Sequence, residues 1–186
     1  MIAAILFALN LELARAAAQQ VGVTTIYDPS YVPLRYPGGD LPVQRGVCAD
    51  VIIRAFRKLG VDLQREVHED MRTHFSAYPQ NWGLRGPDKN IDHRRVPNLM
   101  TFFKRRGKSV SGEFQPGDIV AWSLPGGLYH IGIMADDGRL VIHNIGRGAQ
   151  KEDILHAFPI IGHYRWAGTA RSADSPRLGH PRRSDR

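Results

Sequence analysis

The sequence is poor in cysteine: Cys48 is the single one among 186 residues. One cysteine cannot close an internal disulfide, so a disulfide-stapled scaffold is excluded. His68 and His74 stand six positions apart, which does not fit the spacing of a helical zinc pair, and we predict no structural zinc and no cofactor. A chain of this length can bury a sizeable core without either kind of staple.

Long apolar runs are also missing. The longest one, residues 1–9, falls far short of the roughly 20 residues that a membrane-spanning helix needs, so we predict no stable membrane span. It has two readings. Residues 1–20 form either the remnant of an export signal, with small-residue cleavage sites at 14–18, or a first amphipathic helix. No Lys or Arg precedes the run, and both readings stay open.

The excess of positive charge is modest, with 25 Lys and Arg against 18 Asp and Glu. Part of it lies in residues 168–186, which are rich in Arg, Pro and Ser and are predicted to form a disordered basic tail. No basic surface interleaved with aromatic residues and no nucleic-acid motif is present, so nucleic acid is not expected as a partner. Apolar residues make up 42% of the chain, which is ordinary for a globular protein.

The apolar periodicity changes along the chain. Its first part predicts helices over residues 48–59, 66–75 and 96–106, with Arg54, Arg57 and Lys58 on the solvent side of the first of these. Its second part predicts strands over residues 118–123, 129–135, 140–144 and 160–166. Helices followed by strands indicate an α+β fold in which helices pack on an antiparallel sheet.

Cys48 falls in the first turn of its predicted helix, on the apolar face. The unpaired N–H groups and the dipole of a helix N-terminus stabilise a thiolate, which is the nucleophilic form of cysteine. A lone cysteine on an apolar face is more often part of the core. The histidines decide how much weight the nucleophile reading deserves.

His130 and His143 lie on the two arms of a hairpin that turns at Asp137-Gly138. With a two-residue loop, His143 pairs opposite Gly132 and His130 is its diagonal neighbour on the same face. A four-residue loop would place the two histidines directly opposite each other, and a three-residue loop would separate them. Stacked imidazoles would supply an oriented base for a thiol, whereas the alternative is two strand-end histidines in contact with solvent.

Five segments resemble, in order and spacing, the landmarks of the NlpC-type peptidases, papain-like cysteine hydrolases of bacterial peptidoglycan. They are residues 36–39 (YPGG), 46–51 (GVCADV), 116–120 (PGDIV), 130–134 (HIGIM) and 141–143 (VIH). The resemblance implies a papain-like fold in which Cys48 is the nucleophile, His130 the general base and then acid, and His143 the residue that orients His130. It also implies an amide substrate in peptidoglycan stem peptides. Separately, Tyr27, Tyr31 and Tyr36 could line a substrate groove, whereas the alternative is that these aromatic loop residues pack against the fold.

The surroundings of Cys48 depart from that pattern. Those peptidases usually read Asp-Cys-Ser-Gly, whereas this chain reads Val-Cys-Ala-Asp at residues 47–50. The substrate pocket is therefore expected to differ. A carboxylate at Asp50 would oppose formation of a thiolate on the nearby sulfur.

A closer resemblance is to an uncharacterised bacterial family, domain of unknown function 1287. Residues 27–31, 38–40, 68–71 and 90–98 carry it, and it spans roughly residues 14–166. Members of that family are usually exported, which implies a location in the periplasm or cell envelope.

The segment 90–95 is unusually polar for a loop. Asp92 is a candidate to orient His93, and Arg94 with Arg95 could hold a substrate carboxylate by bidentate hydrogen bonds. The alternative is a solvated loop with local ion pairs.

These observations predict one papain-like cysteine hydrolase domain over residues 21–167. We expect it to cleave an amide bond in peptidoglycan stem peptides through Cys48, His130 and His143. The alternatives are an acyl or lipid-amide transferase on the same fold and a module that binds wall peptides without cleaving them. Fold alone does not choose among the three.

Overall fold

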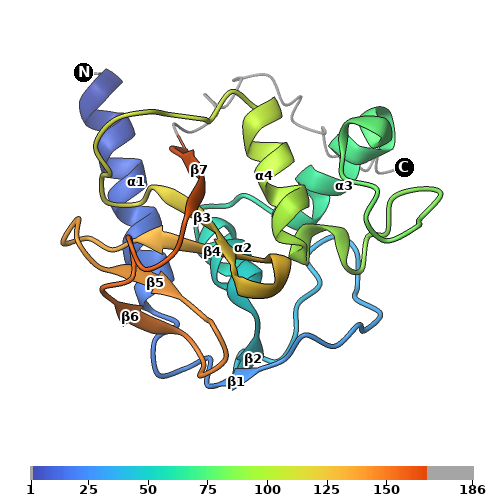
Figure 1. Cartoon of the computed structure of the whole chain (residues 1–186), viewed down its shortest axis with the longest axis horizontal. Coiled ribbons are helices and arrows are strands. Elements are labelled where there is room, and N and C mark those ends of the chain that lie inside the picture. Colours follow the sequence, from blue (N-terminus) through green and yellow to red (C-terminus); the bar gives the residue numbers. More distant parts are fainter. Residues whose placement is uncertain (1, 167–186) are drawn as a thin grey trace, which may run out of the picture.

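The computed structural model describes residues 2–166, and its helices precede its main strands (Figure 1). The helices are α1 (Ile2–Ala18), α2 (Cys48–Lys58), α3 (Leu63–His74) and α4 (Val96–Arg105). Short 3₁₀ turns occupy Phe75–Ala77, Asp92–Arg94 and Pro125–Gly127. The strands are β1 (Ile26–Tyr27), β2 (Arg45–Gly46), β3 (Ile119–Leu124), β4 (Leu128–Met134), β5 (Val141–His143), β6 (Gln150–Glu152) and β7 (Ile160–Tyr164).

The main sheet has five antiparallel strands in the order β6-β5-β4-β3-β7. The predicted α+β class with an antiparallel sheet is confirmed. The parallel pair β1-β2 and the edge strand β6 were not predicted. β1 and β2 have two residues each and β6 has three, which is too short for a clear pattern. β6 (Gln-Lys-Glu) also has no apolar residue that could signal a strand.

The two faces of the sheet bury different cores. Ile131 and Ile133 of β4 face the helices and belong to the larger core, which includes Phe56 of α2 and Phe103 of α4. In Figure 1, α1 and α2 lie side by side and α2 runs across β4, in agreement with the contacts between these elements. The opposite face carries a smaller core, formed by Val120, Trp122, Met134, Val141 and Leu155. His130 alternates with Ile131 along β4 and therefore shares the face of Trp122.

The helix boundaries follow local signals. α2 ends before Gly60, whose φ of 79° suits the left-handed stop after a helix. α3 begins earlier than predicted because the Asp62 side chain caps it by accepting from the Gln64 amide. α4 matches its predicted range closely and ends before Gly107.

α1 packs as part of the fold, since Leu13, Ala14 and Ala17 are fully buried. None of the helices within residues 2–166 is long and apolar enough to cross a membrane. The predicted basic tail, residues 168–186, lies outside the described residues.

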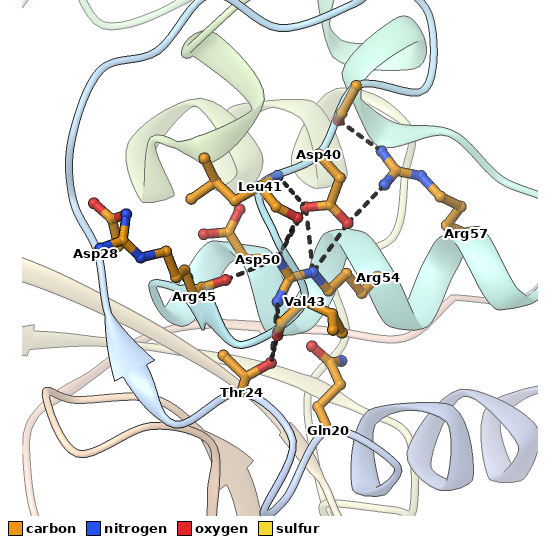
Figure 2. Close-up of polar contacts among 12 residues, drawn as sticks. Gln20, Thr24, Asp28, Asp40, Leu41, Val43, Arg45, Asp50, Arg54 and Arg57 are labelled. Carbon is orange, nitrogen blue, oxygen red and sulfur yellow. Dashed lines mark hydrogen bonds and ion pairs between the residues drawn. The ribbon is translucent and has the colours of Figure 1, made fainter.

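Arg54 corrects one prediction, because it does not face solvent: the residue is only 7% exposed. Figure 2 shows its guanidinium surrounded by acceptors from the chain that leads to α2. It donates to the Asp40 carboxylate at 2.9–3.2 Å, to Thr24 Oγ1, and to the carbonyl oxygens of Val43 and Arg45. Arg54 therefore ties this loop to the helix that begins at Cys48.

Candidate active site

Cys48 is the first residue of α2 and is 6% exposed. Three backbone N–H groups act on its thiol: the amides of Ile131, Ala49 and Cys48 itself favour the thiolate by hydrogen bonding. Ile131 follows His130 directly on β4, so the sulfur lies against the strand that carries the predicted base. The helix N-terminus thus reaches the middle strand of the sheet at the position that the sequence singled out.

Burial nevertheless changes the pKa of the Cys48 thiol more than those amides do. Desolvation, with a smaller contribution from the charge of Asp50, raises the pKa of the Cys48 thiol to about 11. The amides at the helix start favour the thiolate, as expected, but burial opposes it more strongly. Cys48 is therefore a neutral thiol at pH 7, because the loss of hydration destabilises the thiolate more than the helix N-terminus stabilises it.

The hairpin places His130 and His143 together. Gly132 pairs with His143, which is the register predicted for a two-residue loop. His130 Nε2 lies 3.0 Å from His143 Nδ1, and the two ring planes meet at 85°. The side-by-side arrangement of the two imidazoles is confirmed.

Gly132 makes this approach possible. A Cβ atom on Gly132 would lie 2.7 Å from Val141 Cγ1 and 3.2 Å from His143 Cβ. Both distances are shorter than a carbon–carbon contact allows, so a side chain here would push β5 away from β4.

A third group completes the row. Glu152 Oε2 lies 3.0 Å from His143 Nε2, and its Oε1 accepts from Arg147 Nη2 at 2.8 Å. Glu152 stands on β6, the edge strand that was not predicted. No local pattern indicates it, because only the pairing of β6 with β5 brings it beside His143.

His130 is buried, with only 2% of the residue exposed. The indole of Trp122, its cross-strand partner, stacks on it with ring centroids 5.6 Å apart. Desolvation and the neighbouring His143 lower the pKa of His130 to about 3, and burial also lowers the pKa of His143. Both imidazoles are therefore neutral at pH 7 and able to accept a proton.

The described structure has no hydrogen bond between the Cys48 sulfur and His130. Within residues 2–166, the only hydrogen-bond partner of the His130 ring is His143, which takes Nε2 and leaves Nδ1 without a protein partner. His130 and Ile131 are consecutive on β4, so their side chains lie on opposite faces of the sheet.

A groove of about 500 Å³ opens at Cys48. Four exposed side chains form what we call the groove rim: Tyr27, Trp82, Leu128 and Tyr129. Arg94, Arg95 and Val47 line the groove beside Cys48. An aromatic, open groove of this kind suits an extended polar ligand with apolar side groups.

Arg94 does not serve the role that was predicted for it. Its side chain is 2% exposed, and it pairs with Asp50 through Nε at 3.0 Å and Nη2 at 3.0 Å. Its Nη1 donates to Ser30 O and its Nη2 also donates to Asp28 O. Arg94 therefore neutralises Asp50, the carboxylate expected to oppose a thiolate, and has no donor pair left for a substrate carboxylate.

Arg95 remains available. Its guanidinium lies over the Trp82 ring at 4.0 Å from the centroid, and within residues 2–166 it uses only Nη1 in a side-chain hydrogen bond, to Asp92. Of the two adjacent arginines, Arg95 is thus the one that can meet a ligand in the groove.

Asp92, His93 and Tyr36 lie outside the groove lining. Asp92 is buried and pairs with Arg95 rather than orienting His93. His93 is 2% exposed, its Nδ1 has no hydrogen-bond partner, and burial beside Arg94 and Arg57 lowers its pKa to about 3. The Tyr36 hydroxyl donates to Glu69 on α3.

Metal binding finds no support in the described chain: across residues 2–166, no three His, Cys, Asp or Glu side chains cluster closely enough to hold an ion.

Comparison with known proteins places these residues in a family. The profile described as Domain of unknown function (DUF1287) matches residues 14–166, which include Cys48, both histidines and Glu152. The chain belongs to this family. The DUF1287 match spans every helix and strand that contributes to the site.

The uncharacterized protein YijF of Escherichia coli K12 is 56% identical over 167 residues, which cover 84% of this chain and 82% of YijF. No solved structure matches the chain.

Proposed function

We propose that this DUF1287 protein is a papain-like cysteine hydrolase that cleaves an amide bond in peptidoglycan stem peptides. One observation carries the proposal: Cys48, at a helix N-terminus in an open groove, lies against the residue that follows His130, which is paired with His143. A thiol, a neutral base and a residue that orients the base are the parts that nucleophilic amide cleavage requires. The resemblance to NlpC-type peptidases supports the same assignment.

The reaction begins from a neutral pair. As the Cys48 sulfur attacks the amide carbonyl, the S–H proton passes to His130 and a C–S bond forms. The backbone N–H groups of Cys48 and Ala49, at the start of α2, can donate to the oxyanion. His130 then gives its proton to the leaving amine as the C–N bond breaks, and a water molecule activated by His130 releases the acyl group from the sulfur.

The groove suits a peptide that carries a carboxylate. Stem peptides present free carboxylates, and Arg95 offers a guanidinium already held flat against Trp82. The rim side chains Tyr27 and Tyr129 provide apolar area for the rest of the ligand. The net charge of +7 attracts an acidic substrate only weakly by comparison.

A location in the periplasm or cell envelope follows from this proposal, because the substrate is found there. The resemblance to a family whose members are usually exported supports the same location. Detection of the full-length protein in a periplasmic extract, against a cytoplasmic marker enzyme, tests this part independently of activity.

One observation favours a second candidate. The high pKa of Cys48 is what a buried core thiol would show, and such thiols are unreactive. It therefore favours a module that binds wall peptides without cleaving them. The lipid-amide transferase is less well supported, because the groove is open and its rim carries polar aromatic groups instead of forming an apolar tunnel.

Digestion of purified peptidoglycan separates these functions. We expect the wild type to release new amino groups and fragments whose masses identify the bond, and Cys48→Ala to lose this activity by about a thousandfold or more. His130→Ala should lose about 10²- to 10⁴-fold, the range of general acid–base catalysis. His74→Ala is the matched control, because His74 is exposed on α3 away from the groove.

Alkylation of Cys48 by iodoacetamide supplies a readout without substrate. At pH 7 we expect a faster rate in wild type than in His130→Ala, with the difference vanishing above pH 11, where the thiol ionises unaided. Equal rates in both proteins at pH 7, with no new amino groups from peptidoglycan, would leave the binding module as the function.

A further inference from the structure

Glu152 is the charged end of a row of three side chains that starts at His130. His143 joins the two through both of its ring nitrogens, each at 3.0 Å from its partner atom. His143 is fully buried, whereas the Glu152 side chain is 31% exposed. The row therefore crosses one face of the sheet, from β4 over β5 to the edge strand β6.

Hydrogen-bond roles along this row are not independent. A carboxylate offers only acceptors, and Glu152 is held as one by Arg147, which donates to its other oxygen. His143 must then carry its proton on Nε2 to donate to Glu152. A neutral imidazole has one N–H, so His143 Nδ1 is left as an acceptor.

The same logic fixes His130. Since His143 Nδ1 accepts, His130 Nε2 must be the protonated nitrogen that donates to it. His130 Nδ1 is then the nitrogen with the free lone pair, and it is also the ring nitrogen without a protein partner within residues 2–166.

We propose that Glu152 is a positioning residue that sets the tautomers of both histidines and so makes Nδ1 of His130 the base for Cys48. This inference rests on the proposed function and adds a residue to it. Glu152 acts through His143, because it lines a separate pocket of about 550 Å³, which shares no lining residue with the Cys48 groove. When Nδ1 takes the thiol proton, the carboxylate also stabilises the positive charge that the two imidazoles then share.

Glu152→Gln is the sharpest test, because it keeps the size of the side chain. Arg147 holds the oxygen of the amide, so the NH₂ group faces His143 Nε2 and donates where the carboxylate accepted. His143 must then move its proton to Nδ1, and His130 must accept on Nε2 and carry its proton on Nδ1. The variant therefore blocks the base nitrogen without removing any side chain.

Long-range ¹H–¹⁵N correlation spectra of histidine-labelled protein report which ring nitrogen carries the proton. We expect Nε2–H on both histidines in the wild type and Nδ1–H on both in Glu152→Gln. Cys48 alkylation at pH 7 should fall by about 10- to 100-fold in the variant. Removal of Arg147 as well (Glu152→Gln with Arg147→Ala) frees the amide to rotate and should restore part of the wild-type pattern.

Asp153→Asn is the matched control, because it removes a neighbouring carboxylate whose side chain is 67% exposed and pairs with Arg139 instead of a histidine. It should leave the spectra and the alkylation rate unchanged. Nδ1–H on His143 of the wild type, or unchanged tautomers in Glu152→Gln, would overturn the proposal. These spectra do not depend on hydrolysis, so the wild-type tautomers without peptidoglycan cleavage would overturn the proposed function alone.

Discussion

Two regions near Cys48 differ in whether their arginine side chains are fully paired within the protein. The first is the buried arginine network, formed by Asp40, Asp50, Arg54 and Arg94. Its two guanidiniums are buried and donate to carboxylates and carbonyl oxygens, as Figure 2 shows for Arg54. The second is the groove rim, where Arg95 covers Trp82 and keeps donors free. Charges in the first region hold the backbone around Cys48, whereas in the second Arg95 has donors that no side-chain hydrogen bond uses within residues 2–166.

The adjacent residues Arg94 and Arg95 show this division most clearly. One side chain turns inward to Asp50 and the other turns to the groove. An arginine pair in a polar loop therefore does not by itself indicate a carboxylate clamp, because burial of one member changes its task.

Arg94→Leu should give the largest effect on stability. It leaves Asp50 buried without its ion pair, which costs about 3–5 kcal/mol of the free energy of unfolding. Urea denaturation measures this cost. Arg139→Leu, at a side chain that is 75% exposed, should change the free energy by less than about 0.5 kcal/mol. A loss below about 1 kcal/mol for Arg94→Leu would contradict the structural role of the buried arginine network.

Gly132→Ala should come next, on β4, the strand that carries His130. The added Cβ would meet Val141 and His143, and overpacking of this kind costs about 1–3 kcal/mol. The displaced β5 should also weaken the His130–His143 contact and slow alkylation of Cys48. Gly86→Ala is the comparison, since no atom lies within 4 Å of its Cβ position. Equal stability of the two variants would mean that the β4-β5 approach is not tight.

Acid should destabilise the protein through two buried histidines. His93 lies beside Arg94 of the buried arginine network, and His130 follows Tyr129 of the groove rim. Burial lowers both pKa values to about 3 in the folded protein, whereas an unfolded histidine titrates near 6.5. The unfolded chain binds more protons between these values, so stability is present above pH 6.5 and is lost as pH falls toward 3.

Each of these histidines contributes a slope of up to about 1.4 kcal/mol per pH unit in that window. Urea titrations from pH 7 to pH 4 measure the slope, and His93→Gln should reduce it. An unchanged slope in that variant would show that His93 is not buried as a neutral ring.

Arg95→Lys should have the smallest effect and act on binding alone. Lysine keeps the charge beside Asp92 but loses the planar fork and the stacking on Trp82. We expect KM for a substrate with a free carboxylate to rise about 3- to 10-fold, with kcat within about twofold. The same substrate with that carboxylate amidated should show no difference between the variant and the wild type, and a difference there would count against carboxylate recognition.

Much of the fold was predictable because its signals are local. Apolar spacing predicts the helix that begins at Cys48, and Gly60 marks its end. The hairpin turn at Asp137-Gly138 gives the pairing of Gly132 with His143. Glu152 was not predictable, since β6 has no apolar alternation and meets His143 only through pairing with β5.

The sequence by itself determined the α+β order and the place of Cys48 at a helix start, because spacing and turn chemistry act over a few residues. It also offered the hairpin register in which His130 meets His143, among others that it left open. Only the tertiary structure decided that the thiol rests protonated, that Arg54 and Arg94 are buried and that Glu152 reaches His143. Desolvation and ion pairing depend on groups far apart in the chain, and Arg94 and Asp50 are 44 positions apart. The local sequence around either residue therefore does not predict its partner.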